Sequence, residues 1–90
     1  MPPAQNYMTG LILLSATTDS GAEEALRAVL EPFTLEILEV QKIELRGRLI
    51  CGFLIAFDPA HAHAISDDIN QFSHDTGIDA ALDYSEIAAE

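Results

Sequence analysis

Hydrophobic residues fill two stretches of this chain that no charge interrupts. Residues 10–16, GLILLSA, and residues 49–57, LICGFLIAF, are almost entirely apolar at both odd and even positions. Successive side chains of a strand point to opposite faces of its sheet, so this pattern is typical of strands that are covered on both faces. We therefore predict two central strands.

A third stretch, residues 35–45, favours β structure but carries charged residues along its length. Charges suit an edge strand, where they discourage pairing with other chains. Arg46-Gly47-Arg48 joins this stretch to residues 49–57, and a glycine between two β-favouring runs indicates a hairpin turn. The two stretches are expected to form an antiparallel pair.

A first amphipathic helix is expected to begin at Ala22 and to be ended by Pro32. Its apolar stripe comprises Ala22, Ala25, Leu26, Val29, Leu30 and Phe33. Ser20 and Glu23 have the S-x-x-E spacing of a capping box. In that motif the serine side chain accepts from the backbone N–H of Glu23, while the Glu23 side chain reaches back.

A second helix is expected to start at Asp58-Pro59, an N-cap followed by proline at the first helical position. Its apolar stripe comprises Ala62, Ile65, Ile69 and Phe72. Gly77 is placed to provide a left-handed C-terminal cap. From Ile78 to Ser85 apolar and polar residues alternate, which predicts a half-buried edge strand.

The resulting order, βαββαβ, predicts an α+β fold of the split βαβ, or ferredoxin-like, type. This fold has a four-stranded antiparallel sheet with two helices on one face, and its first and third strands are central. Those are the two strands predicted to be apolar on both faces. Because both helices cover the same face, the other apolar face needs a partner or stays partly exposed.

The length of 90 residues fits one domain with a single core. We assign residues 9–90 to that domain and residues 1–8 to a flexible N-terminal tail. The tail has neither the basic nor the apolar region of a secretory signal. No apolar run approaches the ~20 residues that span a bilayer, so we expect a soluble, cytoplasmic protein.

Charge narrows the range of partners. Fifteen acidic residues against four basic ones give a formal net charge of -11, which repels phosphate backbones and anionic lipid surfaces. We therefore expect neither nucleic acid nor a membrane as a partner. Cys51 is the single cysteine; it cannot form an internal disulfide and is expected to be a small buried hydrophobe.

No motif of this sequence indicates catalysis, a cofactor or a metal. A heavy-metal chaperone of this fold would carry C-x-x-C, and an acylphosphatase-type enzyme would need basic residues after the first strand, where Thr17 to Gly21 has none. His61 and His63 are predicted on different faces of a helix, and His74 in its last turn, where it favours the helix dipole. We therefore expect the histidines to be surface residues and not metal ligands.

The chain resembles an ACT domain, and most closely the N-terminal ACT domain of bacterial phosphoserine phosphatases. The resemblance covers nearly the whole chain. The residues that carry it are Gly21 with the following helix pattern, the stretch Glu36 to Val40, and above all Leu45-Arg46-Gly47-Arg48-Leu49 with Gly52. Such domains are regulatory modules that typically bind amino acids, often at the contact with a neighbouring ACT domain.

The resemblance implies a ligand site in the first loop, at Thr18, Asp19, Ser20, Gly21 and Ala22. In the family this loop usually reads D-R-P-G; here the glycine is kept, the proline is lost and the acid is shifted. The acidic residues around the first helix predict weak, millimolar binding of serine or glycine, with the amine toward Asp19 and the carboxylate toward a neighbouring chain.

Two functions follow from the resemblance. The first is a regulatory amino-acid-binding domain in serine biosynthesis, either part of a phosphoserine phosphatase or a stand-alone homologue. The second is an assembly module of the same fold without a ligand, in which Gly21 only allows a tight turn. Both imply a homodimer or a neighbouring ACT domain as partner. The sequence lacks the D-x-D motif of the phosphatase nucleophile, so no enzyme activity is expected of this chain.

Overall fold

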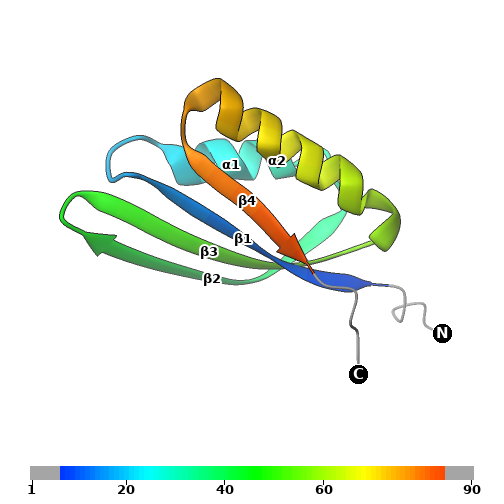
Figure 1. Cartoon of the computed structure of the whole chain (residues 1–90). Helices are drawn as coiled ribbons and strands as arrows, with labels where there is room; N and C mark the ends of the chain where they lie inside the picture. The colour runs from blue at the N-terminus through cyan, green and yellow to red at the C-terminus, as the bar shows by residue number, and fades with distance from the viewer. Residues whose placement is uncertain (1–6, 85–90) are drawn as a thin grey trace.

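The computed structural model describes residues 7–84 as an α/β sandwich (Figure 1). Residues 1–6, most of the predicted tail, and residues 85–90 lie outside the described residues. The elements in chain order are β1 (Met8–Thr17), α1 (Ala22–Leu30), β2 (Leu35–Leu45), β3 (Arg48–Phe57), the short 3-10 helix η2 (Pro59–His61), α2 (Ala62–Thr76) and β4 (Asp79–Tyr84).

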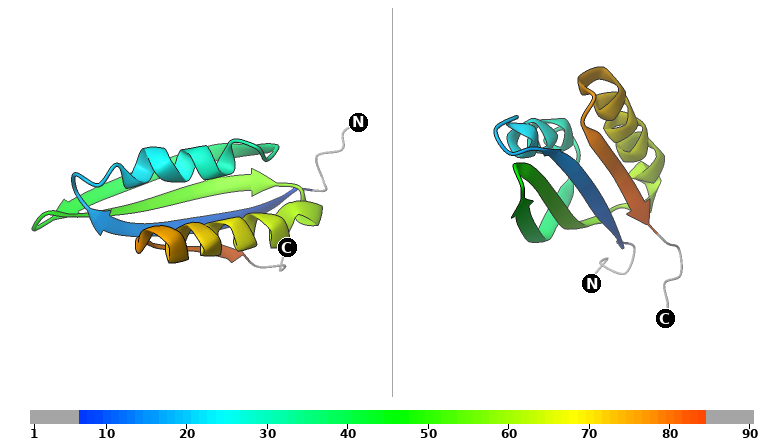
Figure 2. Two further views of the ribbon diagram at one scale, coloured as in Figure 1. Left: turned by 90° about the horizontal axis from the view of Figure 1, so that it is seen from above. Right: turned by 60° about the vertical axis from the view of Figure 1, so that its left-hand side comes forward.

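The four strands form one antiparallel sheet in the order β2-β3-β1-β4. The predicted ferredoxin-like arrangement is confirmed, with the apolar strands β1 and β3 at the centre and the charged strand β2 at one edge. Both helices lie on the same side of the sheet (Figure 2). The opposite side of the sheet is not covered by any element within residues 7–84.

The predicted hairpin turns at Arg46 and Gly47, whose φ angles are 53° and 82°. Positive φ at both central residues of a two-residue loop matches the right-handed twist of the flanking strands, as in type I′ turns. β2 contains one irregularity that the sequence did not predict. Between Ile37 and Glu39 the pairing with β3 shifts by one residue, which leaves Leu38 as the extra residue of a β-bulge.

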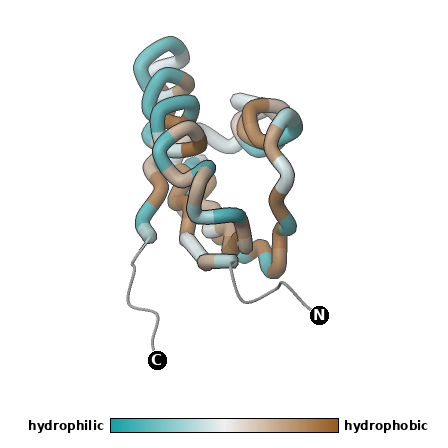
Figure 3. Tube along the Cα trace, turned by 90° about the vertical axis from the view of Figure 1, so that its right-hand side faces the viewer, coloured by the Kyte–Doolittle hydropathy of each residue, from teal (hydrophilic) through white to brown (hydrophobic). Residues whose placement is uncertain are grey.

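The core lies between the helices and the sheet. β3 contributes every second residue from Leu49 to Phe57, and the helices contribute the predicted stripes. The fully buried large side chains are Ile12, Leu14, Leu26, Phe53, Ile55, Phe57, Ile65 and Ile69. The outer side of α2 is hydrophilic (Figure 3), and Arg27 of α1 lies over the Phe53 ring with its guanidinium carbon 5.4 Å from the ring centroid.

The predicted capping box at the start of α1 is wrong. Gly21, in a left-handed conformation with φ 71°, occupies the N-cap position, and no side chain caps the helix. Ser20 therefore lies one residue too early, and its hydroxyl accepts a bond from the N–H of Ala22 at 3.2 Å instead of that of Glu23. The Glu23 carboxylate is held by two cations and does not reach back.

The ends of the helices differ from expectation by less than one turn. α1 ends at Leu30, so Phe33 packs against the core from the following loop. Asp58 caps as predicted, because its side chain accepts from the N–H of Ala60 at 3.0 Å, but the first turn is the 3-10 helix η2 and α2 starts at Ala62. Gly77 adopts the predicted left-handed cap, with φ 76°.

Neither helix of the described chain has the length and apolar composition that crossing a bilayer requires.

Candidate functional site

The turn from β1 to α1 contains all the residues that the sequence suggested for ligand binding. Thr18 donates its N–H to the carbonyl of Gly47 at 2.9 Å, which ties this turn to the β2–β3 hairpin. Gly21 has a positive φ, and a Cβ built on it would meet no atom within 4 Å. The glycine is therefore required by the backbone conformation, while the space beside it is open.

A pocket of about 290 Å³ opens at this turn. Its lining comprises Thr18, Gly21, Ala22, Glu23, Glu24, Lys42, Glu44 and Leu49. The volume is near the lower limit of roughly 300 Å³ for small-molecule pockets. Three of the five suggested residues thus line one cavity, whereas Asp19 and Ser20 do not. The first turn of α1 also presents backbone N–H groups that have no intrahelical acceptor.

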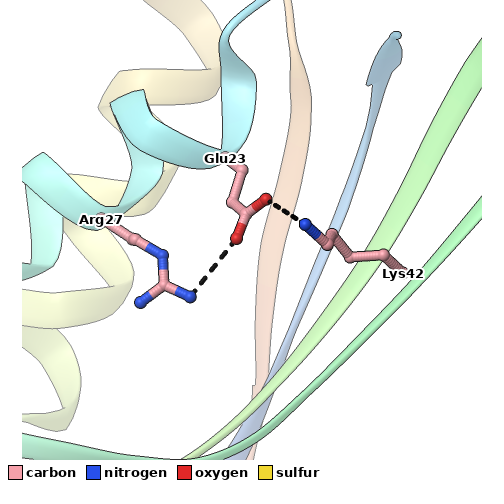
Figure 4. Close-up of polar contacts among 3 residues, drawn as sticks. All are labelled: Glu23, Arg27 and Lys42. Atoms are coloured by element: carbon pink, nitrogen blue, oxygen red, sulfur yellow. Dashed lines mark hydrogen bonds and ion pairs between the residues drawn. The ribbon is translucent and has the colours of Figure 1, made fainter.

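Glu23 is the electrostatic centre of this pocket (Figure 4). Its Oε1 lies 3.0 Å from Lys42 Nζ and its Oε2 lies 3.3 Å from Arg27 Nη2. The hydrogen bond from Lys42 holds the pKa of Glu23 below the usual 4.5, and the same bond raises the pKa of Lys42 above the usual 10.5. Glu23 and Lys42 therefore both stay charged at neutral pH.

The pocket combines charges of both signs on different elements. Glu23 and Glu24 come from α1, whereas Lys42 and Glu44 come from the covered face of β2. The lining therefore offers a cation and several carboxylates within one cavity. The sequence did not single out Lys42 and Glu44, because only the hairpin register and the packing of α1 bring them to the turn.

Groups suited to other chemistry are not gathered in the described part of the chain. Within residues 7–84 no set of three His, Cys, Asp or Glu side chains is placed to hold a metal ion. Cys51 lies in β3 and is fully buried, as predicted. Burial raises the pKa of its thiol, so Cys51 stays protonated and is no nucleophile.

A larger hollow of about 720 Å³ adjoins the pocket along α1 and the first half of β2. Its lining is largely apolar, with Leu30, Phe33, Leu35 and Ile37, and also contains the charged residues Glu24, Arg27, Glu31 and Glu36. The hollow follows the β2 edge of the sheet, where a neighbouring chain would be able to cover it.

Comparison with known proteins supports the resemblance seen in the sequence. No protein-family model matches the chain. Phosphoserine phosphatase SerB2 of Mycobacterium tuberculosis is 33% identical over 78 residues, which are 84% of this chain and 19% of that enzyme. The chain thus spans about a fifth of the curated relative that it matches.

Solved structures agree on the fold. The ACT domain protein from Streptococcus pneumoniae superposes with a TM-score of 0.74 at 12% identity, over 91% of this chain and 98% of that one. The chain has the fold of an ACT domain. Formyltetrahydrofolate deformylase from Burkholderia mallei contains a similar unit, which matches with a TM-score of 0.68 at 12% identity over 83% of this chain and 27% of the deformylase.

Proposed function

We propose that this chain is a regulatory ACT domain that binds a small amino acid, serine or glycine, in the pocket between the β1–α1 turn and β2. The observation that carries the proposal is the presence of Lys42 and several carboxylates around one cavity of about 290 Å³. This charge pattern fits a zwitterion. The similarity to a phosphoserine phosphatase supports a serine-related ligand.

In the proposed complex the ligand carboxylate meets Lys42 and the free backbone N–H groups at the start of α1, which also presents the positive end of its dipole. The amine meets Glu44 and Glu24. Asp19 is not part of the pocket lining, so the amine partner expected from the sequence is replaced here by carboxylates from α1 and β2. Because Glu23 already engages Lys42 at 3.0 Å, the ligand competes with an internal ion pair and binds weakly.

We further propose that a second copy pairs through the β2 edge and covers both the pocket and the larger hollow beside it. A two-fold axis at Ile43, which is 54% exposed, would place Lys42 of each chain opposite Glu44 of the other. Opposite charges at directly facing positions favour such a strand pair. The pairing is isologous, as expected of a homodimer, and a neighbouring ACT domain of a longer chain could take the same place.

The proposal extends to the protein in which this domain works. The domain acts within a phosphoserine phosphatase of serine biosynthesis, or as a separate homologue that senses the same amino acid. The catalytic step of such an enzyme would belong to another domain. The buried, protonated Cys51 is compatible with a reducing cytoplasm.

Calorimetric titration of the domain with serine and glycine tests the binding. We expect millimolar affinity, a driving force of roughly 4 kcal/mol, and its loss in Lys42→Met. Arg46→Met is the matched control, because it removes a cation from the hairpin turn, outside the pocket lining. Micromolar binding that survives both Lys42→Met and Gly21→Val would place the effector elsewhere.

The second candidate is an assembly module without a ligand, which the exposed β2 edge favours. Sedimentation at tens of micromolar separates the two. A dimer that binds neither amino acid supports assembly alone, and a dimer that tightens with serine supports the regulatory function. Glu44→Lys should weaken the dimer, and adding Lys42→Glu should restore it. A monomer at all these concentrations would contradict both candidates.

A further inference from the structure

The face of the sheet opposite the helices carries a continuous apolar stripe. We call it the open face; its large residues are Leu11, Leu13, Ile43, Leu45, Ile50 and Leu54. Leu13 is 49% exposed and Ile50 is 40% exposed, whereas the neighbouring Leu14 and Cys51, which point to the helices, are buried. Apolar side chains gathered in this way on a small acidic domain indicate an interaction surface.

The strand register shows that the stripe runs diagonally. Leu11 of β1 pairs with Leu54 of β3, and Leu13 pairs with Gly52. Ile50 of β3 then pairs with Ile43 of β2, so the stripe crosses from β1 to β2. A Cβ built on Gly52 would meet only Leu11 Cδ1, at 3.8 Å. The glycine therefore leaves a low point in the middle of the stripe, into which a partner's side chain can fit.

Carboxylates border the stripe on both sides. On the β4 side Asp83 pairs with Leu11, and Asp79 pairs with Ser15. On the β2 side Glu39 pairs with Leu54. Paired residues of adjacent strands point to the same face, so these carboxylates flank the apolar residues. Arg48, at the hairpin end of the face, donates to Ser15 Oγ at 2.8 Å.

The acidic margins disfavour a second copy of this chain on the open face. If the two-fold axis ran along the strands, the β4 margin would face the β2 margin of the copy, and Asp would meet Glu. If it ran across the strands, each margin would face itself. In both cases carboxylates oppose carboxylates between two chains of net charge -11, and juxtaposed like charges oppose association.

We propose that the open face is the docking surface for an amphipathic helix of another protein, whose apolar stripe is flanked by Lys and Arg. The outer strands β2 and β4 are three strand spacings apart, which is about 14 Å. A helix with side chains is about 10–12 Å wide, so it fits between the margins. Its leucines would lie on Leu11, Leu13 and Ile50, and its cations would meet Asp79, Asp83 and Glu39.

A designed helical peptide of about 18 residues, long enough for about 27 Å, provides the probe. It has a leucine stripe flanked by lysines, and fluorescence anisotropy follows its binding to the domain. A peptide of the same composition without the stripe, and one with Glu in place of Lys, are the controls. We expect only the first peptide to bind with micromolar affinity, and its binding to weaken as salt is added.

Substitutions on the domain distinguish binding at the open face from nonspecific attraction to an acidic chain. We expect Leu13→Asn, and independently Ile50→Thr, to weaken binding about tenfold or more, as loss of a central contact does. Asp79→Asn with Asp83→Asn should weaken it about fivefold. The control, Asp67→Asn with Asp68→Asn, removes the same charge from the exposed side of α2 and should change nothing. Circular dichroism confirms that each variant is folded.

Three results would overturn the proposal. The first is equal binding of the striped and unstriped basic peptides, because the attraction would then be charge alone. The second is an equal loss in the α2 control pair. The third is a dimer of the unmodified domain that Leu13→Asn dissociates, because the occupant of the open face would then be a second copy.

Discussion

The two faces of the sheet are built from the same strands but differ in burial. On β1, Leu14 is 1% exposed and packs under the helices, whereas the adjacent Leu13 is 49% exposed. Both are leucines in the same apolar run. The comparison teaches that an apolar pattern on both parities does not by itself mean burial on both faces: one set of residues builds the core, and the other is available to a partner.

The cause lies in the connections between strands. β1 is joined to β2 through α1, and β3 is joined to β4 through α2. Crossover connections of this kind are nearly always right-handed, so both helices are placed on the same side of the sheet. Within residues 7–84 no further element covers the open face, so β1 and β3 keep an apolar surface that this part of the chain does not bury.

The largest expected effect is the difference in the free energy of unfolding between substitutions at two adjacent residues, one on each face. Leu14→Ala removes a fully buried side chain and should lower the free energy of unfolding by roughly 2 to 5 kcal/mol, as should Leu26→Ala on α1. Leu13→Ala, on the open face, should cost less than about 1 kcal/mol. Chemical denaturation measures all three. Equal losses at Leu13 and Leu14 would mean that the open face is buried in the folded state in solution.

The two glycines of the central strands offer a second, smaller contrast. A Cβ on Gly10 would lie 2.9 Å from Leu82 Cδ1 and 3.0 Å from Phe57 Cε1 on the covered face. Gly10→Ala should therefore destabilise the domain by about 1 to 3 kcal/mol through overpacking.

Gly52→Ala is the matched control on the open face, where the nearest atom is 3.8 Å away. Glycine weakens a strand relative to alanine by roughly 0.5 to 1 kcal/mol, so this substitution should leave the stability unchanged or raise it by that amount. Thermal and chemical unfolding report both variants. A stabilising Gly10→Ala would show that the contact with Phe57 is looser than described.

The smallest effect concerns charge. The pKa of Glu23 is below its usual 4.5 because Lys42 donates to it. A carboxyl with a lowered pKa stabilises the fold above its unfolded pKa and loses that contribution as the pH falls through the folded pKa. The pair should therefore contribute fully at pH 7, begin to lose its contribution as the pH falls below about 4.5, and lose it completely only below the lower pKa of the folded state.

A carbon-detected NMR titration of the Glu23 carboxyl group tests this linkage. Its midpoint should lie below 4.5 in the unmodified domain and should rise in Lys42→Met. Arg48→Met removes a cation from the open face and should leave the midpoint unchanged. A midpoint that does not respond to Lys42→Met would show that Arg27, or another group, dominates the shift.

The sequence alone determined the order of the elements and their approximate ends. Gly47 between two β-favouring runs predicted the hairpin, Asp58-Pro59 and Gly77 predicted the start and end of the second helical region, and the βαββαβ order then left one sheet topology. These signals succeeded because they are local: a left-handed glycine, a capping carboxylate and an apolar periodicity act within a few residues.

The tertiary structure decided the outcome wherever a local sequence signal competed with contacts to residues distant in the chain. Ser20 and Glu23 had the spacing of a capping box, yet Gly21 became the N-cap and Glu23 turned to Lys42, a residue 19 positions away. The pocket at Thr18 and Gly21 is completed by β2 for the same reason, because pairing across the sheet places Lys42 and Glu44 there. The crossover connections likewise determined which apolar face the helices cover. The strand sequence could not determine this, because β1 and β3 are apolar on both faces.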